Sequence, residues 1–240
     1  MNKTSKRPIY LQLKEKLFDR ISSQEWKPGD CLPSERALCE EYTLSRMTVR
    51  QAVAELEREG VVTRVQGKGT FVAKEKLMQP LLKLTSFSED MRLRGLLPGA
   101  QTLALEKVPA NKAVAEKLAI APGDEVILLK RLRLADGEPM AIETAYLNSE
   151  LCAPIYDQLA ENKSLYQLMK RVLHITLSGA RQSIEIAPVQ SWEAKLLRMP
   201  ETGMVMKTER QTLDTHMAPV EYVISKYRGD RYKFYIELFE

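Results

Sequence analysis

Apolar residues recur at four-residue intervals near the start of the chain, at Ile9, Leu13, Leu17 and Ile21. This spacing gathers them on one face of a helix and predicts an amphipathic helix over residues 8–23. Its apolar face is expected to pack behind the elements that follow.

Two further helices are predicted over residues 35–42 and 46–59. Ser34 and Ser45 precede them, and a serine hydroxyl in that position accepts from the free amides of a helix start. Only the turn Thr43-Leu44 and the capping residue Ser45 separate the helices, and so short a connection is typical of a helix-turn-helix. The apolar positions of the second helix, expected to face the core, are Val49, Ala52, Val53 and Leu56.

The opposite arc of this second helix carries Met47, Arg50, Gln51 and Ala54, with Arg46 and Thr48 in its first turn. A helix start presents unpaired amide donors and partial positive charge. Next to two guanidiniums and a hydroxyl, it suits phosphates and base edges in the major groove of DNA. The alternative is a generic helical bundle with a solvated charged face.

Two β-rich runs follow, residues 61–65 and 70–72, and they flank the tip Gln66-Gly67-Lys68-Gly69. Glycines in a hairpin tip let the backbone approach another polymer closely, and the lysine adds positive charge. We interpret this hairpin as a wing that reaches the neighbouring minor groove or its phosphates.

The net charge is concentrated in this segment. The first 76 residues hold 15 Lys and Arg against 11 Asp and Glu, whereas the rest of the chain holds 21 against 21. The entire excess of +4 therefore accompanies the helix-turn-helix, as expected for a module that binds a polyanion.

The stretch PGDCLPSERALCEEYTLSRMTVRQAVAELEREGVVTRVQGKGTFV, residues 28–72, resembles the winged-helix DNA-binding domain of the GntR superfamily of bacterial transcription regulators. The resemblance implies that Arg36 and Arg46 hold phosphates and that Thr48 and Arg50 lie at the groove. Ser45, at the same helix start, is included among the DNA-binding residues. The implied wing tip consists of Gln66, Gly67, Lys68 and Gly69.

A mixed charged stretch ending in Pro80 follows the wing, and proline breaks both helix and sheet. We therefore expect a DNA-binding domain over residues 1–76, a linker over residues 77–80 and a second domain over residues 81–240. In the second domain, alternation predicts strands at residues 102–108, 125–134, 139–147, 177–187, 204–212, 220–227 and 233–238. Helices are predicted at residues 86–94, 112–118, 165–173 and 191–197. Short turns between strands favour an α+β domain with a mostly antiparallel sheet.

Strand alternation also gathers polar side chains into a candidate cleft. Arg131 and Arg133 are two apart and share a face, where paired guanidiniums suit a phosphate or carboxylate. Glu143, on the next strand, is placed to approach them. The same period puts Glu221, Ser225 and Tyr227 on one face. Hydroxyls at two helix starts, the segment Thr85-Ser86-Phe87-Ser88 and Ser164, add anion-binding capacity. Taken alone, each arginine or serine is better explained as a surface charge or a routine cap.

The segments LTSFSEDMRLRG, LLKRLRLADGEPMAIETAYL and PVEYVISKYRGDRYKF resemble the effector-binding UTRA domain of the HutC-type branch of GntR regulators. The resemblance implies a chorismate-lyase-like fold with a ligand held between sheet and helices. It is strongest to regulators of N-acetylglucosamine use, which implies a phosphorylated amino sugar as effector. By that resemblance the phosphate is cradled by Ser86, Phe87, Ser88, Arg131, Arg133 and Ser164, and the sugar ring is read by Glu143, Glu221 and Tyr227.

Several classes of function are disfavoured. Cys31, Cys39 and Cys152 have no metal-like spacing, so reduced, mostly buried thiols, no metal and no cofactor are expected. The N-terminus lacks the apolar core of a secretion signal and no apolar run is long enough for a membrane helix, so a cytoplasmic protein without membrane contact is expected.

We therefore expect a transcription regulator, a repressor by preference, that binds a palindromic operator as a homodimer and responds to a small anion. A different sugar phosphate or an organic acid is the alternative effector. Two other classes remain: a lyase-like enzyme using the C-terminal pocket, and a constitutive architectural DNA binder. Neither histidine belongs to a recognisable acid–base constellation, which weighs against the enzyme.

Overall fold

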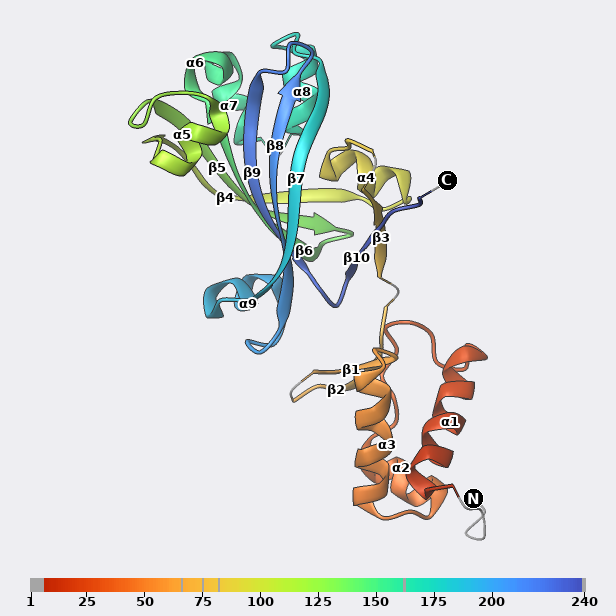
Figure 1. The fold of residues 1–240 in the computed structure, drawn as a ribbon. Coiled ribbons are helices and arrows are strands. Elements are labelled where there is room, and N and C mark those ends of the chain that lie inside the picture. The colour runs from red at the N-terminus through yellow and green to blue at the C-terminus, as the bar shows by residue number, and fades with distance from the viewer. Residues whose placement is uncertain (1–6, 66, 75, 82, 162, 239–240) are drawn as a thin grey trace. The chain divides into compact units, whose positions relative to one another are not determined.

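A computed structural model describes residues 7–65, 67–74, 76–81, 83–161 and 163–238 (Figure 1). The chain divides into two compact units, Met1–Lys76 and Leu77–Glu240. Within the described ranges, no helix combines the length and the apolar character needed to cross a membrane.

The first unit contains the three predicted helices, α1 (Ile9–Ser22), α2 (Glu35–Tyr42) and α3 (Arg46–Arg58). The predicted serine caps are confirmed. The hydroxyl of Ser34 accepts from the Ala37 amide at 3.2 Å, and that of Ser45 accepts from the Thr48 amide at 3.3 Å. Thr43, in the left-handed region at φ 53°, closes the turn between α2 and α3.

The core of this unit forms where the predicted apolar faces meet. Its buried members are Leu13, Leu17, Leu32, Leu38, Val49, Ala52, Val53, Leu56, Val62 and Val72. Helix α1 contributes the first two, and the four predicted positions of α3 are all buried. The first helix is therefore a structural support for α2 and α3.

The predicted wing is an antiparallel hairpin of β1 (Val62–Val65) and β2 (Gly69–Val72). An isolated bridge between Cys31 and Phe71 adds the chain before α2 to its edge. Cys31 is exposed, Cys39 is half-buried and only Cys152 is buried, so the expectation of mostly buried thiols was wrong. Cys31 is exposed because it pairs at the edge of the hairpin, which leaves its side chain beside the hairpin instead of in the core.

The second unit is built on a six-stranded sheet with the order β4-β5-β6-β9-β8-β7. All of its neighbouring strands are antiparallel, which confirms the predicted α+β class. The strands are β4 (Pro98–Pro109), β5 (Glu125–Ala135), β6 (Glu138–Asn148), β7 (Leu177–Pro188), β8 (Met204–Asp214) and β9 (Pro219–Arg228).

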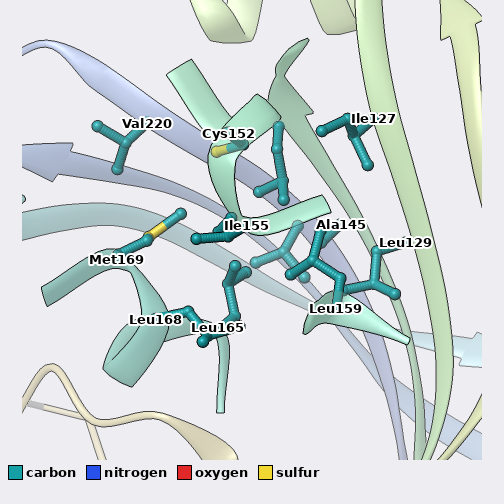
Figure 2. Close-up of a cluster of buried hydrophobic side chains, with 12 residues drawn as sticks. Ile127, Leu129, Ala145, Cys152, Ile155, Leu159, Leu165, Leu168, Met169 and Val220 are labelled. Carbon is teal, nitrogen blue, oxygen red and sulfur yellow. The ribbon is translucent and has the colours of Figure 1, made fainter. Parts of the chain in front are cut away.

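Helices cover both faces of this sheet. They are α4 (Phe87–Leu93), α5 (Lys112–Leu118), α6 (Ser149–Cys152), α7 (Tyr156–Leu159), α8 (Leu165–Arg171) and α9 (Ser191–Leu197), with a 3-10 turn η1 (Ala153–Ile155). On one face, α6, η1, α7 and α8 pack on β5, β6 and β9 around Ile127, Leu129 and Leu147 (Figure 2). Helix α4 packs on the same face, beside Ala141 and Tyr227. Helices α5 and α9 cover the opposite face.

The expected linker over residues 77–80 was wrong. These residues form strand β3 (Leu77–Pro80), which pairs in parallel with β10 (Tyr232–Tyr235). The strand predicted over residues 233–238 is confirmed for residues 233–235, and residues 236–238 are not in a strand. Pro80 is tolerated because it is the final residue of a strand in a two-stranded sheet. The segment α6–η1–α7 was not predicted, because runs of three or four residues are too short for helical periodicity to appear.

Candidate functional site

A band of polar residues crosses one face of the sheet between two apolar clusters. Along β5, Ile127 and Leu129 belong to the cluster under α6–α8, whereas Ala135 belongs to the cluster under α4. Between them on the same face lie Arg131 and Arg133, each only 3% exposed. The residues that line the resulting cavity, here called the polar pocket, are Gln79, Thr85, Ser86, Phe87, Arg131, Arg133, Glu143, Ser164, Leu165, Tyr166, Thr208, Arg210, Glu221, Val223, Ser225 and Tyr227.

Arg131 is bound to Glu143 on the neighbouring strand, directly opposite in the register. Its Nη2 and Nε donate to Glu143 Oε1 at 2.5 and 3.2 Å, and its Nη1 donates to the Lys163 carbonyl at 3.3 Å. Burial alone raises the pKa of Glu143, but the charges of Arg131 and Arg133 outweigh burial and hold that pKa below its usual value. Arg131 and Glu143 thus form a buried ion pair.

Arg133 is differently placed. Its Nη2 donates to the Ser88 hydroxyl at 2.9 Å, and its guanidinium carbon lies 4.6 Å from the centroid of the Phe87 ring. Its Nε and Nη1 are buried without a hydrogen-bond partner. Burial lowers the pKa of Arg133, although arginine stays charged in proteins. An uncompensated buried guanidinium is costly, and an anion in the pocket would satisfy it.

A third guanidinium, that of Arg210, and a second carboxylate, that of Glu221, also line the polar pocket. Arg210 donates from Nε to Gln182 Oε1 at 2.7 Å. Glu221 accepts from the hydroxyls of Thr212 and Tyr166 at 2.7 and 3.1 Å. Burial raises the pKa of Glu221, and the nearby charge of Glu143 adds to this rise.

The described lining residues therefore present three guanidiniums against two carboxylates. Two further buried oxygens in the lining, Gln79 Oε1 and Ser164 Oγ, also have no partner. Native proteins satisfy almost all buried polar atoms, so several unsatisfied ones around one cavity point to a polar ligand. The cavity itself has a volume of about 40 Å³, which means that side chains must move to admit more than a few atoms.

Nine of the ten residues predicted for this cleft line the polar pocket. Ser88 does not, because its hydroxyl is turned to Arg133 and supports that side chain from behind. Sequence reasoning missed Gln79, Tyr166, Thr208 and Arg210, whereas Thr85 belongs to the helix start that was expected to bind anions. The alternation of Thr208, Arg210 and Thr212 along β8 was an available signal, whereas Gln79 was hidden in the expected linker.

No group of three or more His, Cys, Asp or Glu side chains within the described ranges is arranged to hold a metal ion. The polar pocket is instead lined by arginines, hydroxyl groups and aromatic rings. Such groups bind anions through charge-assisted hydrogen bonds.

In the first unit, the predicted DNA-binding residues of α2 and α3 lie on an exposed surface. The side chains of Arg46 and Arg50 are 78% and 58% exposed, and Arg36, paired with Glu40 at 3.0 Å, is 87% exposed. Ser45 caps α3, and its hydroxyl lies 2.9 Å from that of Thr48. We call Arg36, Arg46, Arg50, Arg64 and Lys68 the cationic face.

Glu35, at the start of α2, organises the arginines around it. Its carboxylate lies 3.1 Å from Arg64 of the wing, 3.9 Å from Arg50 and 4.0 Å from Arg46. These longer contacts with α3 are weak at exposed positions. Arg46 and Arg50 are thus drawn toward Glu35 but remain available to an outside partner.

The wing tip is glycine-dependent. Gly67 and Gly69 have φ of 73° and 128°, and a Cβ on Gly69 would lie 3.1 Å from the Cys31 sulfur. The Lys68 amide donates to the Val65 carbonyl at 2.9 Å, which closes the turn. Gln66, the remaining predicted residue of the tip, lies outside the described residues.

Both halves of the chain match known families. Residues 9–72 match the bacterial regulatory proteins of the gntR family, and residues 93–233 match the UTRA domain. The chain belongs to the GntR family. Its combination of winged helix and UTRA domain is that of the HutC-type branch, as the resemblance in the sequence implied.

Relatives of this GntR protein match over nearly their whole length. The HTH-type transcriptional repressor NagR of Bacillus subtilis (strain 168) is 37% identical over 234 residues, which span 98% of this chain and 96% of NagR. The mannosyl-D-glycerate transport/metabolism system repressor MngR of Escherichia coli (strain K12) is 31% identical over 230 residues, 95% of each chain.

A solved structure shares the architecture. PhnF from Mycobacterium smegmatis superposes with a TM-score of 0.66 at 28% identity, and the match covers 97% of this chain and 99% of PhnF. The GntR protein described here is accordingly a DNA-binding transcription regulator with an effector-binding domain.

Proposed function

We propose that this regulator is a repressor that binds a palindromic operator as a homodimer and changes its DNA affinity when the polar pocket takes up a phosphorylated amino sugar. The observation that carries the ligand class is the buried guanidinium of Arg133, with two nitrogens lacking partners. The repressor role is supported by NagR and MngR, both described as repressors.

DNA recognition is assigned to the cationic face and the start of α3. Thr48 and Arg50 would contact base edges in the major groove, while Arg36, Ser45 and Arg46 would hold phosphates. The wing tip, Gln66 to Gly69, would reach the adjacent backbone or minor groove. One such module reads only a few base pairs, so two modules on half-sites about a helical turn apart would supply specificity.

In the polar pocket, Arg131, Arg133, Ser86 and Ser164 would surround the phosphate, with Phe87 beside Arg133 and Ser88 behind it. Glu143, Glu221, Ser225 and Tyr227 offer carboxylates and hydroxyls for the hydroxyl and amide groups of the sugar. The family resemblance favours N-acetylglucosamine 6-phosphate or glucosamine 6-phosphate. Another sugar phosphate or an organic acid would use the same arginines.

The effect of ligand binding on the DNA-binding domain would be transmitted first through Gln79. This residue lines the pocket and belongs to β3, which starts at the first residue of the second unit. A ligand that satisfies the unpaired Gln79 Oε1 and widens the cavity would favour one position of β3. Binding energy that differs between two arrangements by about 1 to 3 kcal/mol is enough for a typical allosteric response.

The test begins by selecting, from a pool of random DNA duplexes, those that the full-length protein binds. The selected duplex then serves as the operator. Gel-shift titrations then compare N-acetylglucosamine 6-phosphate, glucosamine 6-phosphate, unphosphorylated N-acetylglucosamine and citrate. We expect a palindromic consensus and a loss of DNA affinity with a phosphorylated sugar only. Unchanged affinity with both phosphorylated sugars would refute the effector, and failure to enrich any duplex would refute the DNA-binding role.

A further inference from the structure

A large groove adjoins the polar pocket and is lined by α4 and α8. It has a volume of about 740 Å³, against about 40 Å³ for the polar pocket itself. Sites for small molecules typically measure about 300–1,000 Å³, so the groove offers the space that the pocket lacks. We call it the outer groove, and its lining includes Glu89, Arg92, Leu93, Gln167, Lys170 and Arg171.

The outer groove and the polar pocket share two lining residues, Ser86 and Tyr166. Ser86 caps α4 by accepting from the Glu89 amide at 3.2 Å. Tyr166 comes from α8, and its hydroxyl donates to Glu221 of the polar pocket at 3.1 Å. These two side chains therefore form the boundary between the two cavities.

Both helices place cations along the outer groove. Arg92 follows Glu89 by three residues on α4, and Lys170 follows Tyr166 by four residues on α8. Such spacings put side chains on one face of a helix. Arg92, Lys170 and Arg171 are exposed, and in the part of the chain that the structure describes no hydrogen bond or ion pair engages their side chains. The described lining thus has three unpaired cations against one carboxylate, that of Glu89.

These cations also have an ordinary structural role. Arg92 lies in the last turn of α4, and Lys170 and Arg171 lie in the last turn of α8. Positive charge at the end of a helix complements the partial negative charge of its unpaired carbonyls. That role does not require the cations of two helices to line one groove beside a buried, incompletely paired arginine.

We propose that the outer groove is a second anion-binding site, which a phosphorylated effector occupies before it enters the polar pocket. Apolar side chains also line the groove, those of Leu84, Ile175 and Leu177. Cations beside low-dielectric walls focus their field and raise the local concentration of an anionic ligand. Movement of Ser86 and Tyr166 would then admit the anion to the polar pocket. This inference rests on the proposed function and adds a further ligand site and an entry route to it.

Binding in the outer groove is expected to be weak. Ion pairs with exposed cations contribute little to stability, so an anion held there exchanges rapidly with solvent. In the polar pocket, by contrast, Arg133 is buried with two nitrogens lacking partners, and an anion that reaches it is held more firmly. The outer groove should therefore affect mainly the rate at which the effector associates.

Association kinetics test the entry route in the full-length protein. Surface plasmon resonance measures the binding of N-acetylglucosamine 6-phosphate to wild type and to the double variant Lys170→Gln/Arg171→Gln. The association rate of the variant should fall by at least about threefold at low salt, and less at high salt, because salt screens the attraction. The dissociation rate should not rise, since the groove holds the ligand only during entry. An unchanged association rate, or a faster dissociation, would overturn the entry route.

The matched control is the double variant Lys195→Gln/Arg198→Gln. It also removes one lysine and one arginine from the C-terminal end of a seven-residue helix, α9, which covers the opposite face of the sheet. Its association rate should equal that of wild type, and thermal melts verify that both double variants are folded. An equal fall in the control would mean that only net charge matters, and would overturn the role of the groove.

Phosphorus NMR tests the outer site itself. In an Arg133→Ala background, which weakens the polar pocket, the phosphorus line of N-acetylglucosamine 6-phosphate should still broaden when the protein is added. Adding Lys170→Gln/Arg171→Gln should remove most of this broadening, whereas adding Lys195→Gln/Arg198→Gln should not. The cationic face of the first unit contributes equally to all three proteins. Equal broadening by all three would overturn the outer site.

Calorimetry of the wild type with the same sugar phosphate tests the proposed effector separately. No measurable binding would refute that effector and the entry route together. Normal calorimetric binding with equal broadening in the three NMR samples would overturn the outer groove alone and leave the assignment of the polar pocket standing.

Discussion

The guanidinium of Arg133 lies over the ring of Phe87, with its central carbon 4.6 Å from the ring centroid. The ring and the Ser88 hydroxyl hold this cation in the polar pocket, where its Nε and Nη1 have no partner. Arg131, two residues earlier, is bound to Glu143. The two arginines of one strand therefore have different roles, and their removal should have different results.

Arg133→Ala should abolish the response to the effector and leave DNA affinity unchanged. Hydrogen bonds to charged groups contribute about 1.5–3 kcal/mol, so the affinity for the sugar phosphate should fall by about ten- to a hundredfold. Because the guanidinium is buried without full compensation, the ligand-free protein should lose little stability. Calorimetric titration and a thermal melt measure the two quantities, and a normal effector response in this variant would show that the anion site is misplaced.

Arg131→Ala is the matched comparison. It leaves Glu143 buried without its ion-pair partner, so the ligand-free protein should be destabilised by about 3–5 kcal/mol. Denaturant unfolding of both variants measures the contrast. Equal destabilisation by the two substitutions would contradict the distinction between a structural and a ligand-binding arginine.

Arg50→Ala should lower operator affinity by at least about tenfold, since a good side-chain contact to a base contributes about 1–3 kcal/mol. Arg58→Ala is the control, because Arg58 is an exposed arginine on the same helix, 3.0 Å from Glu55 and at the end away from the proposed groove contacts. Fluorescence anisotropy with the selected duplex measures both. Equal losses would indicate a general charge effect and not recognition by the start of α3.

Gly69→Ala should weaken DNA binding more than Gly67→Ala. Both glycines have positive φ, but only at Gly69 would a Cβ approach another atom closely, the Cys31 sulfur at 3.1 Å. The strain at Gly67 alone should cost about 1 kcal/mol. Operator affinity and the thermal melt of each variant are compared with wild type, and a smaller effect at Gly69 would argue against a tightly held wing.

Glu221→Gln should make stability less sensitive to pH. The folded-state pKa of Glu221 is raised above the usual 4.5, mainly by burial. Its contribution to stability is therefore fully present below about pH 4.5 and is lost as the pH rises through the folded-state pKa. The glutamine side chain does not ionise, so the variant does not lose this stability. The melting temperature of the variant should therefore rise relative to that of wild type as the pH rises. A constant difference between the two proteins would show that Glu221 does not titrate in this way.

Much of the polar pocket was predictable because a strand has a simple period. Residues 131 and 133 share a face by alternation, as do 221, 225 and 227, and the register of β5 with β6 then places Glu143 opposite Arg131. Arg210 follows the same rule on β8, but the run Lys207 to Arg210 resembles a solvated charged surface. The sequence does not reveal that Arg210 lies under a helical layer.

Features that depend on distant pairing were not predictable. Gln79 reaches the pocket because β3 pairs with β10, more than 150 residues later in the chain. No local pattern announces such a partner, and Pro80 argued against a strand. The orientation of the Ser88 hydroxyl toward Arg133 was also beyond reach, since a serine near a helix start offers the same pattern whether it faces a ligand or a neighbouring side chain.

The polar band between the two apolar clusters has one more consequence. A continuous hydrophobic layer would hold α4 and α8 on the sheet by itself. Here that layer is interrupted in the middle by arginines and carboxylates. Under the proposed function, the effector would fill this interruption and complete the contact between the helices and the sheet. The response to the effector would then depend on how completely the interior of the domain is packed.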